Sequence, residues 1–235
     1  MTPTEMTQIQ VVDKNRKEND PEAFPDSIKS TRLPAAERKR LLISQAVDTF
    51  SVRGFHATSM EDVAVAAGVT KPVIYQHFRS KRHLYVAILR HVGLEMKEVL
   101  SQGTSKASGG KMRLYAGMEA YFKYAYENAT AYELLFGSGG RRDPEFRDLV
   151  AEIEQDLAAH VTSTIDVDLD PEHRELAAVS IMGIAEAVMR LYFSKYPPAS
   201  LNSDKRPPFV GSSAETWSKR AADLAWAGLR AIHRD

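Results

Sequence analysis

Cysteine is absent from the 235 residues, so the chain has neither a disulfide framework nor a thiolate metal site. The N-terminus also lacks a basic start followed by an apolar segment, and we therefore expect no secretory signal. The longest apolar stretch, residues 176–193, carries Glu186 and Arg190, which indicates a buried helix rather than a membrane span. From these absences we expect a cytoplasmic protein that has no membrane partner.

Familiar catalytic and metal-binding motifs are missing as well. The seven histidines form no HExxH pair, and neither a GxSxG motif nor a phosphate loop occurs. The acidic segment 166–172 lacks the spacing of a calcium loop and precedes a helix that begins with proline, where acidic charge is favourable. We expect no enzymatic activity, no metal and no cofactor.

Residues 58–81 have the pattern of two short helices around a glycine turn. An apolar stripe at the spacing i, i+3, i+4 and i+7 predicts the first helix: Met60, Val63, Ala64 and Ala67. Ser59 with Asp62 fits a capping box, as Thr58 does with Glu61, so this helix should begin near residue 59. Gly68 supplies the positive φ that ends a helix and turns the chain.

The second short helix has side chains suited to contacting DNA. Thr70 can cap it, and an early Pro72 needs no amide partner. Ile74 and Phe78 are four residues apart and should point inward. The remaining face combines phosphate-binding and base-binding chemistry: Lys71, Pro72, Tyr75 and Gln76, with Val73 and His77 beside them. The pattern predicts a helix-turn-helix, with an ordinary surface helix of a small bundle as the alternative.

A net charge of zero conceals an uneven distribution. Residues 32–90 contain ten Lys or Arg and four Asp or Glu, which gives +6, and the remainder therefore carries −6. A local positive charge attached to a slightly negative body is what a DNA-binding module on a separate body requires, because phosphate attraction must be local.

Segment 53–85, RGFHATSMEDVAVAAGVTKPVIYQHFRSKRHLY, resembles the DNA-binding signature of the TetR family of transcriptional regulators. The preceding segment 35–53 fits the first helix of that family. The resemblance implies double-stranded DNA with a palindromic operator as the partner of a homodimer. It implies phosphate contacts from Thr58, Tyr75, His77 and Lys81, and base-edge contacts from Thr70, Lys71, Pro72, Val73 and Gln76.

The fold expected is all-α, with an N-terminal three-helix helix-turn-helix domain (32–80) and a C-terminal helical ligand-binding and dimerisation domain (81–235). Residues 1–31 are polar without periodicity and are expected to be a disordered tail. Lys29 and Arg32 at its end suit a minor-groove arm, and a solvated tail is the alternative.

Beyond residue 81 every long periodic segment is helical. A linking helix is expected at 81–100, followed by a flexible loop at 101–110. Asp143 before Pro144 and Asp170 before Pro171 mark two helix starts. The full set of expected body helices is 112–128, 131–136, 144–164, 171–195 and 214–233. The proline-rich loop 196–213 could cover a pocket or simply be mobile.

Small residues on the last two helices predict a subunit interface. By its resemblance to the TetR family, the chain should pair these helices with those of a second subunit in a four-helix bundle. The alternative is an internal core. The expected interface residues are Ala177, Ala178, Gly183, Ala185, Trp217, Ala221, Leu224, Ala225 and Gly228.

Aromatic and methionine side chains in the body predict an apolar cavity for a hydrophobic effector. The candidate lining is Met118, Phe122, Tyr126, Phe136, Phe146, Met182 and Met189. Segments KPVIYQHFRSK, YELLF and AWAGL are similar to those of fatty-acid-biosynthesis regulators within the TetR family, which implies a long-chain acyl-CoA as effector. Arg141 and Arg142 could meet its phosphates or lie in a solvated loop. We expect a repressor released by its ligand; an activator of the same fold and a ligand-free architectural DNA binder are the alternatives.

Overall fold

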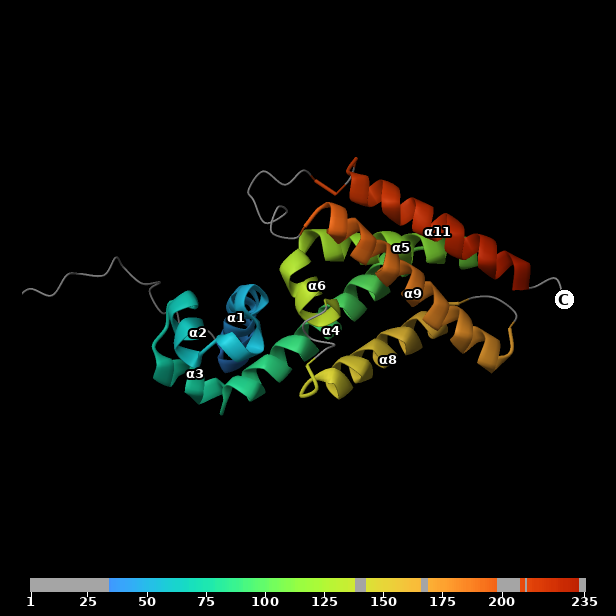
Figure 1. Cartoon of the computed structure of the whole chain (residues 1–235). Coiled ribbons are helices and arrows are strands. Elements are labelled where there is room, and N and C mark those ends of the chain that lie inside the picture. Colours follow the sequence, from blue (N-terminus) through green and yellow to red (C-terminus); the bar gives the residue numbers. More distant parts are fainter. Residues whose placement is uncertain (1–33, 138–142, 166–168, 198–207, 210, 233–235) are drawn as a thin grey trace, which may run out of the picture. The chain divides into compact units, whose positions relative to one another are not determined.

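Nine α-helices form the secondary structure of the residues that the computed structural model describes, which are 34–137, 143–165, 169–197, 208–209 and 211–232 (Figure 1). Those residues contain no strand, which confirms the expected all-α fold. The helices are α1 (Ala35–Ala57), α2 (Met60–Ala66), α3 (Lys71–His77), α4 (Lys81–Thr104), α5 (Gly110–Glu127), α6 (Ala129–Phe136), α8 (Arg147–Thr164), α9 (Pro171–Lys195) and α11 (Ser213–Ile232). The predicted tail 1–31, Arg141, Arg142 and most of the predicted loop 196–213 lie outside the described residues.

The first three helices form the predicted helix-turn-helix unit. Ser59 caps α2 in a complete capping box with Asp62, and Gly68 has a φ of 63° in the turn before α3. Thr70 occupies the N-cap position of α3 as predicted, but its side chain makes no capping hydrogen bond, and its backbone oxygen accepts from the Val73 amide. α1 contacts α2, α4 and α6. Its buried residues are Leu42, Ile43, Ala46, Val47 and Phe50.

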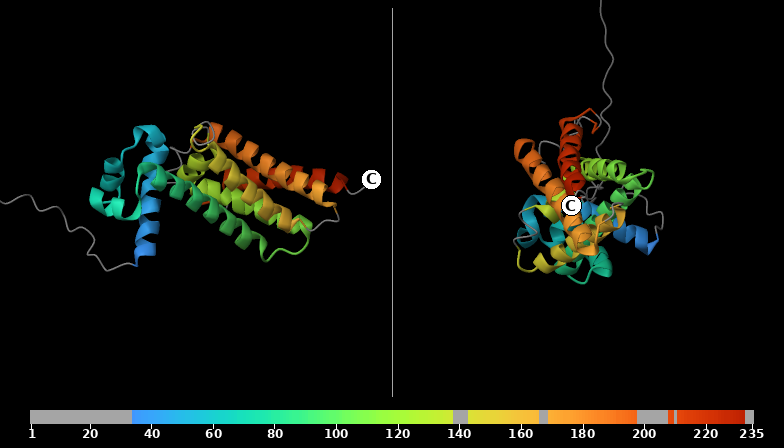
Figure 2. Two further views of the ribbon diagram at one scale, coloured as in Figure 1. Left: turned by 90° about the horizontal axis from the view of Figure 1, so that it is seen from below. Right: turned by 90° about the vertical axis from the view of Figure 1, so that its right-hand side faces the viewer.

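α4 is continuous over 24 residues and contacts both the helix-turn-helix unit and the body. Figure 2 shows it running beside α5 and α8. It extends four residues into the predicted loop 101–110, because Gly103 lets α4 and α5 approach: a Cβ at this position would lie 2.7 Å from Ala120 Cβ. The start predicted at Pro144 is also wrong, since α8 begins at Arg147 after a turn that buries Phe146.

The body helices pack as pairs around a common core. α5 contacts α4 and α11, while α9 contacts α8 and α11. Asp170 caps α9 by accepting from the His173 amide, as predicted for the helix that begins at Pro171. The buried aromatic side chains Tyr121, Tyr126 and Tyr192 belong to this core.

α9 is also long and apolar enough to meet a simple criterion for crossing a membrane. Its most apolar 18-residue window has a mean hydropathy of 1.6, and 33% of that window is buried within the chain. Leu176, Val179 and Leu191 are exposed large apolar residues on this helix. Length and composition alone do not distinguish a membrane span from a soluble helix with one uncovered face, and α9 packs on α8 and α11 in the described fold.

Candidate DNA interface and effector cavity

The outer face of α3 is exposed as the spacing predicts. Ile74 and Phe78 have no exposed surface and anchor the helix, whereas Lys71, Pro72 and Gln76 are exposed. Tyr75 is 45% exposed, and Val73 and His77 are half-buried at the edge of this face. The exposed set offers an ammonium group, a phenol and an amide, which can bind phosphates and base edges in a groove of DNA.

Lys71 is held by an acidic residue of the neighbouring helix. Its Nζ donates to Glu61 Oε2 over 3.1 Å, and both side chains are exposed. This hydrogen bond and the charge of Glu61 raise the pKa of Lys71, so the ammonium is protonated at neutral pH. An exposed ion pair is weak and is screened by salt, which leaves the lysine free to exchange Glu61 for a phosphate or a base.

We expect Glu61→Gln to tighten operator binding. The substitution removes a carboxylate that competes for Lys71 and repels phosphates, so the Kd should fall about 2-fold to 5-fold at low salt and less at high salt. Fluorescence anisotropy at fixed salt measures this change. Glu119→Gln on α5 alters the net charge equally at an exposed position and should leave the Kd unchanged. A Glu61→Gln Kd equal to that of wild type would contradict an approach of Lys71 to DNA.

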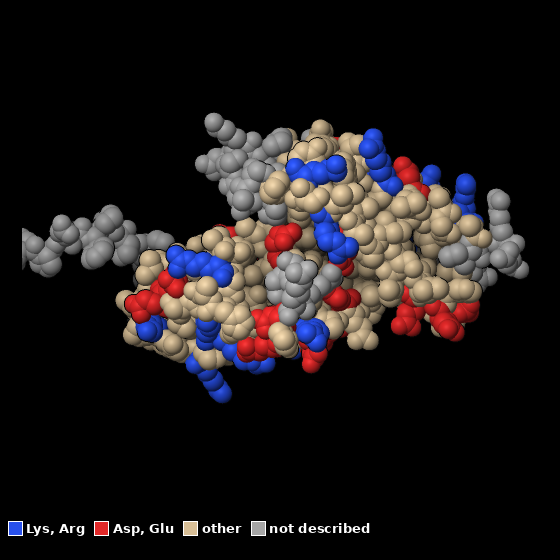
Figure 3. Space-filling view, in the orientation of Figure 1, with Lys and Arg blue, Asp and Glu red and all other residues tan. Residues whose placement is uncertain are grey.

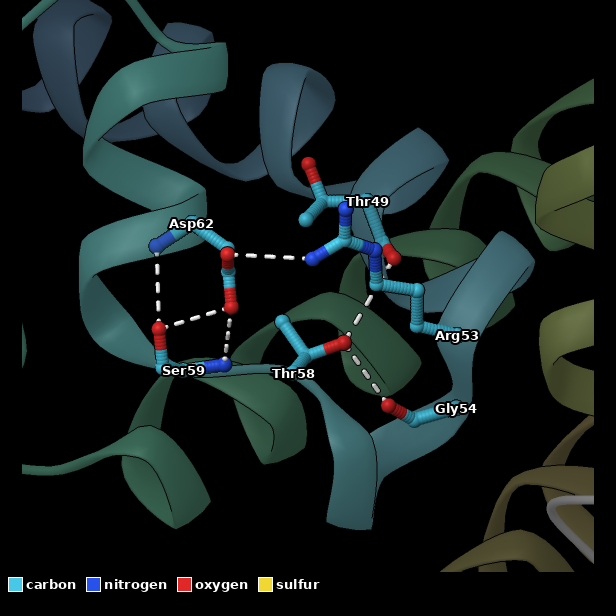
Figure 4. A network of polar contacts seen from close by, with 6 residues as sticks. All are labelled: Thr49, Arg53, Gly54, Thr58, Ser59 and Asp62. Carbon is cyan, nitrogen blue, oxygen red and sulfur yellow. Dashed lines mark hydrogen bonds and ion pairs between the residues drawn. The ribbon is translucent and has the colours of Figure 1, made fainter.

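Polar contacts fix the chain between α1 and α2 (Figure 4). Thr58 is buried, and its hydroxyl donates to the backbone oxygen of Gly54 over 2.8 Å. The prediction that this side chain contacts a phosphate is therefore wrong, because its only hydroxyl hydrogen is used inside the turn. Ser59 bonds both the backbone and the carboxylate of Asp62, and Arg53 pairs with the same carboxylate over 3.0 Å.

These contacts predict a pH dependence of stability. The hydrogen bonds from Ser59, followed by the charge of Arg53, hold the pKa of Asp62 below its usual 3.8 in the folded state. The stabilisation is therefore present above pH 3.8 and is lost as the pH falls through the lower folded value. Asp62→Asn should lower the Tm at pH 7 and lose that effect in strong acid. A difference in Tm that does not vary with pH in calorimetry would contradict this role.

Two further phosphate contacts predicted from the sequence need correction. Lys81 is half-buried, and its Nζ donates to the His56 backbone oxygen over 3.2 Å and lies 4.5 Å from the centroid of the Phe55 ring. Its ammonium therefore joins the start of α4 to the end of α1. His77 is half-buried, and its Nε2 is buried without a partner among the described residues, so a phosphate contact from this side chain would have to use the other ring nitrogen.

Other cations, which the helix-turn-helix pattern did not single out, lie near the same surface. Arg79 is exposed directly after α3, and its backbone amide donates to His83 Nδ1 over 3.2 Å. Lys39 of α1 lies 5.5 Å from the centroid of the Phe78 ring. Figure 3 shows basic side chains over α3 and the start of α4. Only the count of charges in residues 32–90 indicated this cluster.

An apolar cavity lies within the body. Its empty space, counted together with the open solvent at its mouth, is about 630 Å³. Helices α4, α5, α8, α9 and α11 contribute its lining: Leu100, Thr104, Gly110, Arg113, Leu114, Gly117, Met118, Tyr121, His160, Val161, Thr164, Ile165, Ile181, Met182, Ala185 and Leu229. Met118 and Met182 were predicted from the sequence.

The other predicted lining residues lie elsewhere. Phe122 and Met189 have no exposed surface and belong to the core, and Tyr126 packs on Tyr192 and Phe209. Phe146 packs on Phe55 and Tyr85 beside the helix-turn-helix unit. Phe136 lines a separate groove between α8 and α9, to which Met182 also contributes. The prediction of a cavity lined by these residues is wrong because most of the aromatic side chains fill the core.

The predicted interface residues divide into two groups. Five alanines are buried within the chain itself and cannot form the surface of an interface: Ala177, Ala178, Ala185, Ala221 and Ala225. Trp217 is half-buried and packs on Tyr192 with ring centroids 5.5 Å apart. Gly183 and Gly228 are exposed, and a Cβ at either position would meet nothing within 4 Å. Leu224 is 62% exposed.

Comparison with known proteins agrees with this architecture. Residues 42–88 match the model of bacterial regulatory proteins, tetR family. The HTH-type transcriptional activator FasR of Mycolicibacterium smegmatis is 31% identical over 204 residues, which cover 86% of this chain and 87% of that protein. The chain belongs to the TetR family. The chain is therefore a DNA-binding transcriptional regulator rather than an enzyme.

Solved structures of TetR-type regulators share the fold. A TetR-like regulator from Rhodococcus sp. RHA1 has a TM-score of 0.63 and 23% identity, covering 85% of this chain and 99% of that one. The regulator FadR from Bacillus subtilis, in complex with stearoyl-CoA, has a TM-score of 0.64 and 16% identity, covering 79% and 96%. At these identities the likeness establishes the TetR fold and leaves the effector to other arguments.

Proposed function

We propose that this TetR-family regulator is a cytoplasmic homodimer that binds a palindromic operator and is controlled by a hydrophobic effector, with a long-chain acyl-CoA as the leading candidate. The observation that carries the proposal is the position of α4. Leu100 and Thr104 near its end line the apolar cavity, while its start adjoins the helix-turn-helix unit. An effector that favours one position of α4 would change how α3 of each subunit is placed against the operator.

The chemistry of the cavity supports an aliphatic ligand. Most of its wall is aliphatic side chain or methionine, which adapts to flexible chains. The FadR structure of the same fold holds stearoyl-CoA, and we extend that ligand class to this chain as part of the proposal.

The uncovered face of α9 and α11 supports a homodimer. Leu176, Val179 and Leu191 on α9 and Leu224 on α11 are exposed, and Gly183 and Gly228 leave open space beside them. Apolar side chains around small residues suit a close helix-helix contact with a second copy. A symmetric pair of reading helices requires a palindromic site.

Palmitoyl-CoA should weaken operator binding. Because allosteric couplings are typically about 1 to 3 kcal/mol, the operator Kd should rise about 5-fold to 150-fold at saturation. Fluorescence anisotropy at fixed salt measures the change, and calorimetry measures ligand binding. If neither palmitoyl-CoA nor other lipophilic compounds bind or alter the Kd, a ligand-free architectural DNA binder becomes the better account.

Filling the cavity should reproduce the effect of the ligand. Met118→Trp and Met182→Trp place a large side chain in the lining and should raise the operator Kd without ligand. Met112→Trp is the matched control, because Met112 is exposed at the start of α5. A normal Kd in folded Met118→Trp and Met182→Trp proteins would contradict a cavity coupled to the reading helices.

The direction of regulation has two candidates. The expectation from the sequence is a repressor that leaves its operator on binding ligand. The name of the FasR relative, a transcriptional activator, favours activation as the second candidate. Transcription from a promoter carrying the operator, with and without the protein, separates them by its sign.

A further inference from the structure

One polar group in the wall of the cavity has no partner in the protein. His160 lies near the end of α8 and lines the cavity, and its Nε2 is buried without a hydrogen-bond partner among the described residues. A buried polar atom left unbonded is costly, so such an atom usually has a partner in the functional state.

The other polar groups of the wall have partners. Thr104 and Thr164 donate their hydroxyl hydrogens to the backbone oxygens of Leu100 and Val161. The Tyr121 hydroxyl bonds that of Tyr132 over 2.9 Å, and Arg113 Nε donates to the Ala107 backbone oxygen. Within the described wall, His160 Nε2 is therefore the polar side-chain atom that is buried without a partner.

The surroundings of His160 define the chemistry of that group. Burial, with a further contribution from the positive charge of Lys97 on α4, lowers the pKa of His160, so the imidazole is neutral at physiological pH. A neutral imidazole donates one hydrogen bond from one nitrogen, and an uncharged carbonyl can accept it without the cost of burying the charge that a carboxylate carries. Lys97 is exposed nearby, where an anionic head outside the cavity would meet a favourable charge.

We propose that His160 Nε2 donates a hydrogen bond to the thioester carbonyl oxygen of a bound long-chain acyl-CoA, whose hydrocarbon chain fills the cavity toward Met118 and Ala185. This assignment rests on the proposed function. It makes His160 a specificity residue that selects a carbonyl at the head of an aliphatic chain. The tail contributes affinity through buried area, and the carbonyl fixes how deeply the tail enters.

The decisive test compares two ligands that differ in one group. Palmitoyl-CoA carries the thioester carbonyl, and S-hexadecyl-CoA has the same chain length and the same head without it. Wild type should bind palmitoyl-CoA about 5-fold to 10-fold more tightly in calorimetry, as expected for one neutral hydrogen bond. Equal affinity of wild type for the two ligands would overturn the assignment, and this comparison needs no variant to fold.

The variant His160→Leu tests whether His160 causes the preference for palmitoyl-CoA over S-hexadecyl-CoA. It should abolish the preference for palmitoyl-CoA and leave the affinity for S-hexadecyl-CoA within about 2-fold, because it removes only a donor. Its Tm without ligand should equal or exceed that of wild type, since leucine removes an unbonded buried polar atom. His160→Gln keeps an N–H donor and should retain part of the preference.

The outcomes separate this inference from the proposed function. Equal losses of affinity for both ligands in His160→Leu would make His160 a packing residue and overturn the assignment alone. A preference for palmitoyl-CoA that survives in His160→Leu would do the same. If wild type binds neither ligand, the acyl-CoA effector and the role of His160 both fail, while operator binding by the TetR-type unit is unaffected.

Discussion

Replacing Lys71 or Tyr75 with alanine should abolish specific operator binding while the dimer stays folded. Both side chains are exposed on the outer face of α3, whereas Ile74 and Phe78 hold that helix from the inside. Each lost contact should cost about 1 to 3 kcal/mol per half-site. A dimer loses the contact twice, so the operator Kd should rise roughly 30-fold to more than 10,000-fold.

Fluorescence anisotropy at one salt concentration measures this loss, because phosphate contacts make affinities at different salt concentrations incomparable. Lys123→Ala is the control for Lys71→Ala: it removes the same charge from an exposed site on α5. Sedimentation confirms that each variant remains a dimer. Operator affinity close to wild type in Lys71→Ala or Tyr75→Ala would show that α3 is not the recognition helix.

Gly228→Glu should give a folded monomer that no longer binds the operator. Gly228 is exposed on α11, and a Cβ there meets nothing within 4 Å, so the protomer can accommodate the side chain. In a dimer formed through this face, the same substitution buries an unpaired carboxylate at close helix contact, at a cost of several kcal/mol. A monomer presents a single α3 to DNA, and one such helix binds too weakly to specify an operator.

Sedimentation together with circular dichroism distinguishes loss of the dimer from loss of the fold. Ser101→Glu adds the same charge at an exposed position of α4 and should remain dimeric. Gly228→Ala tests size without charge and should be milder than Gly228→Glu. An intact Gly228→Glu dimer would mean that subunits meet through another face, and the exposed apolar side chains of α9 would then need a different explanation.

The helix-turn-helix could be predicted from the sequence because its signals are local. The capping box joins Ser59 to Asp62, the turn depends on one positive φ at Gly68, and the core contacts come from residues four apart. Side-chain direction was harder to predict wherever a distant residue decides it. Lys81 faces the His56 carbonyl, 25 residues earlier, and no spacing rule indicates such a contact.

The sequence predicted that the body has an apolar cavity, but it predicted only some of the residues that line it. Composition indicates that aromatic and methionine side chains are buried, but it cannot distinguish a filled core from a cavity wall. Phe146 packs in the core on Phe55 and Tyr85, whereas Met118 borders the cavity. Phe146 and Met118 are nevertheless both apolar residues in segments predicted to be helical. His160 carried no signal at all, because an unbonded nitrogen is a property of three-dimensional packing.

The length of α4 means that a small tilt at one end produces a large displacement at the other. Its 24 residues extend over about 36 Å at 1.5 Å per residue, from the cavity wall to the residues that follow α3. A tilt of about 5° pivoting at the cavity end would carry the other end through about 3 Å. That distance is close to the roughly 3.4 Å between successive bases along one strand. A tilt of this size in α4 would therefore set α3 out of step with its operator by about one base.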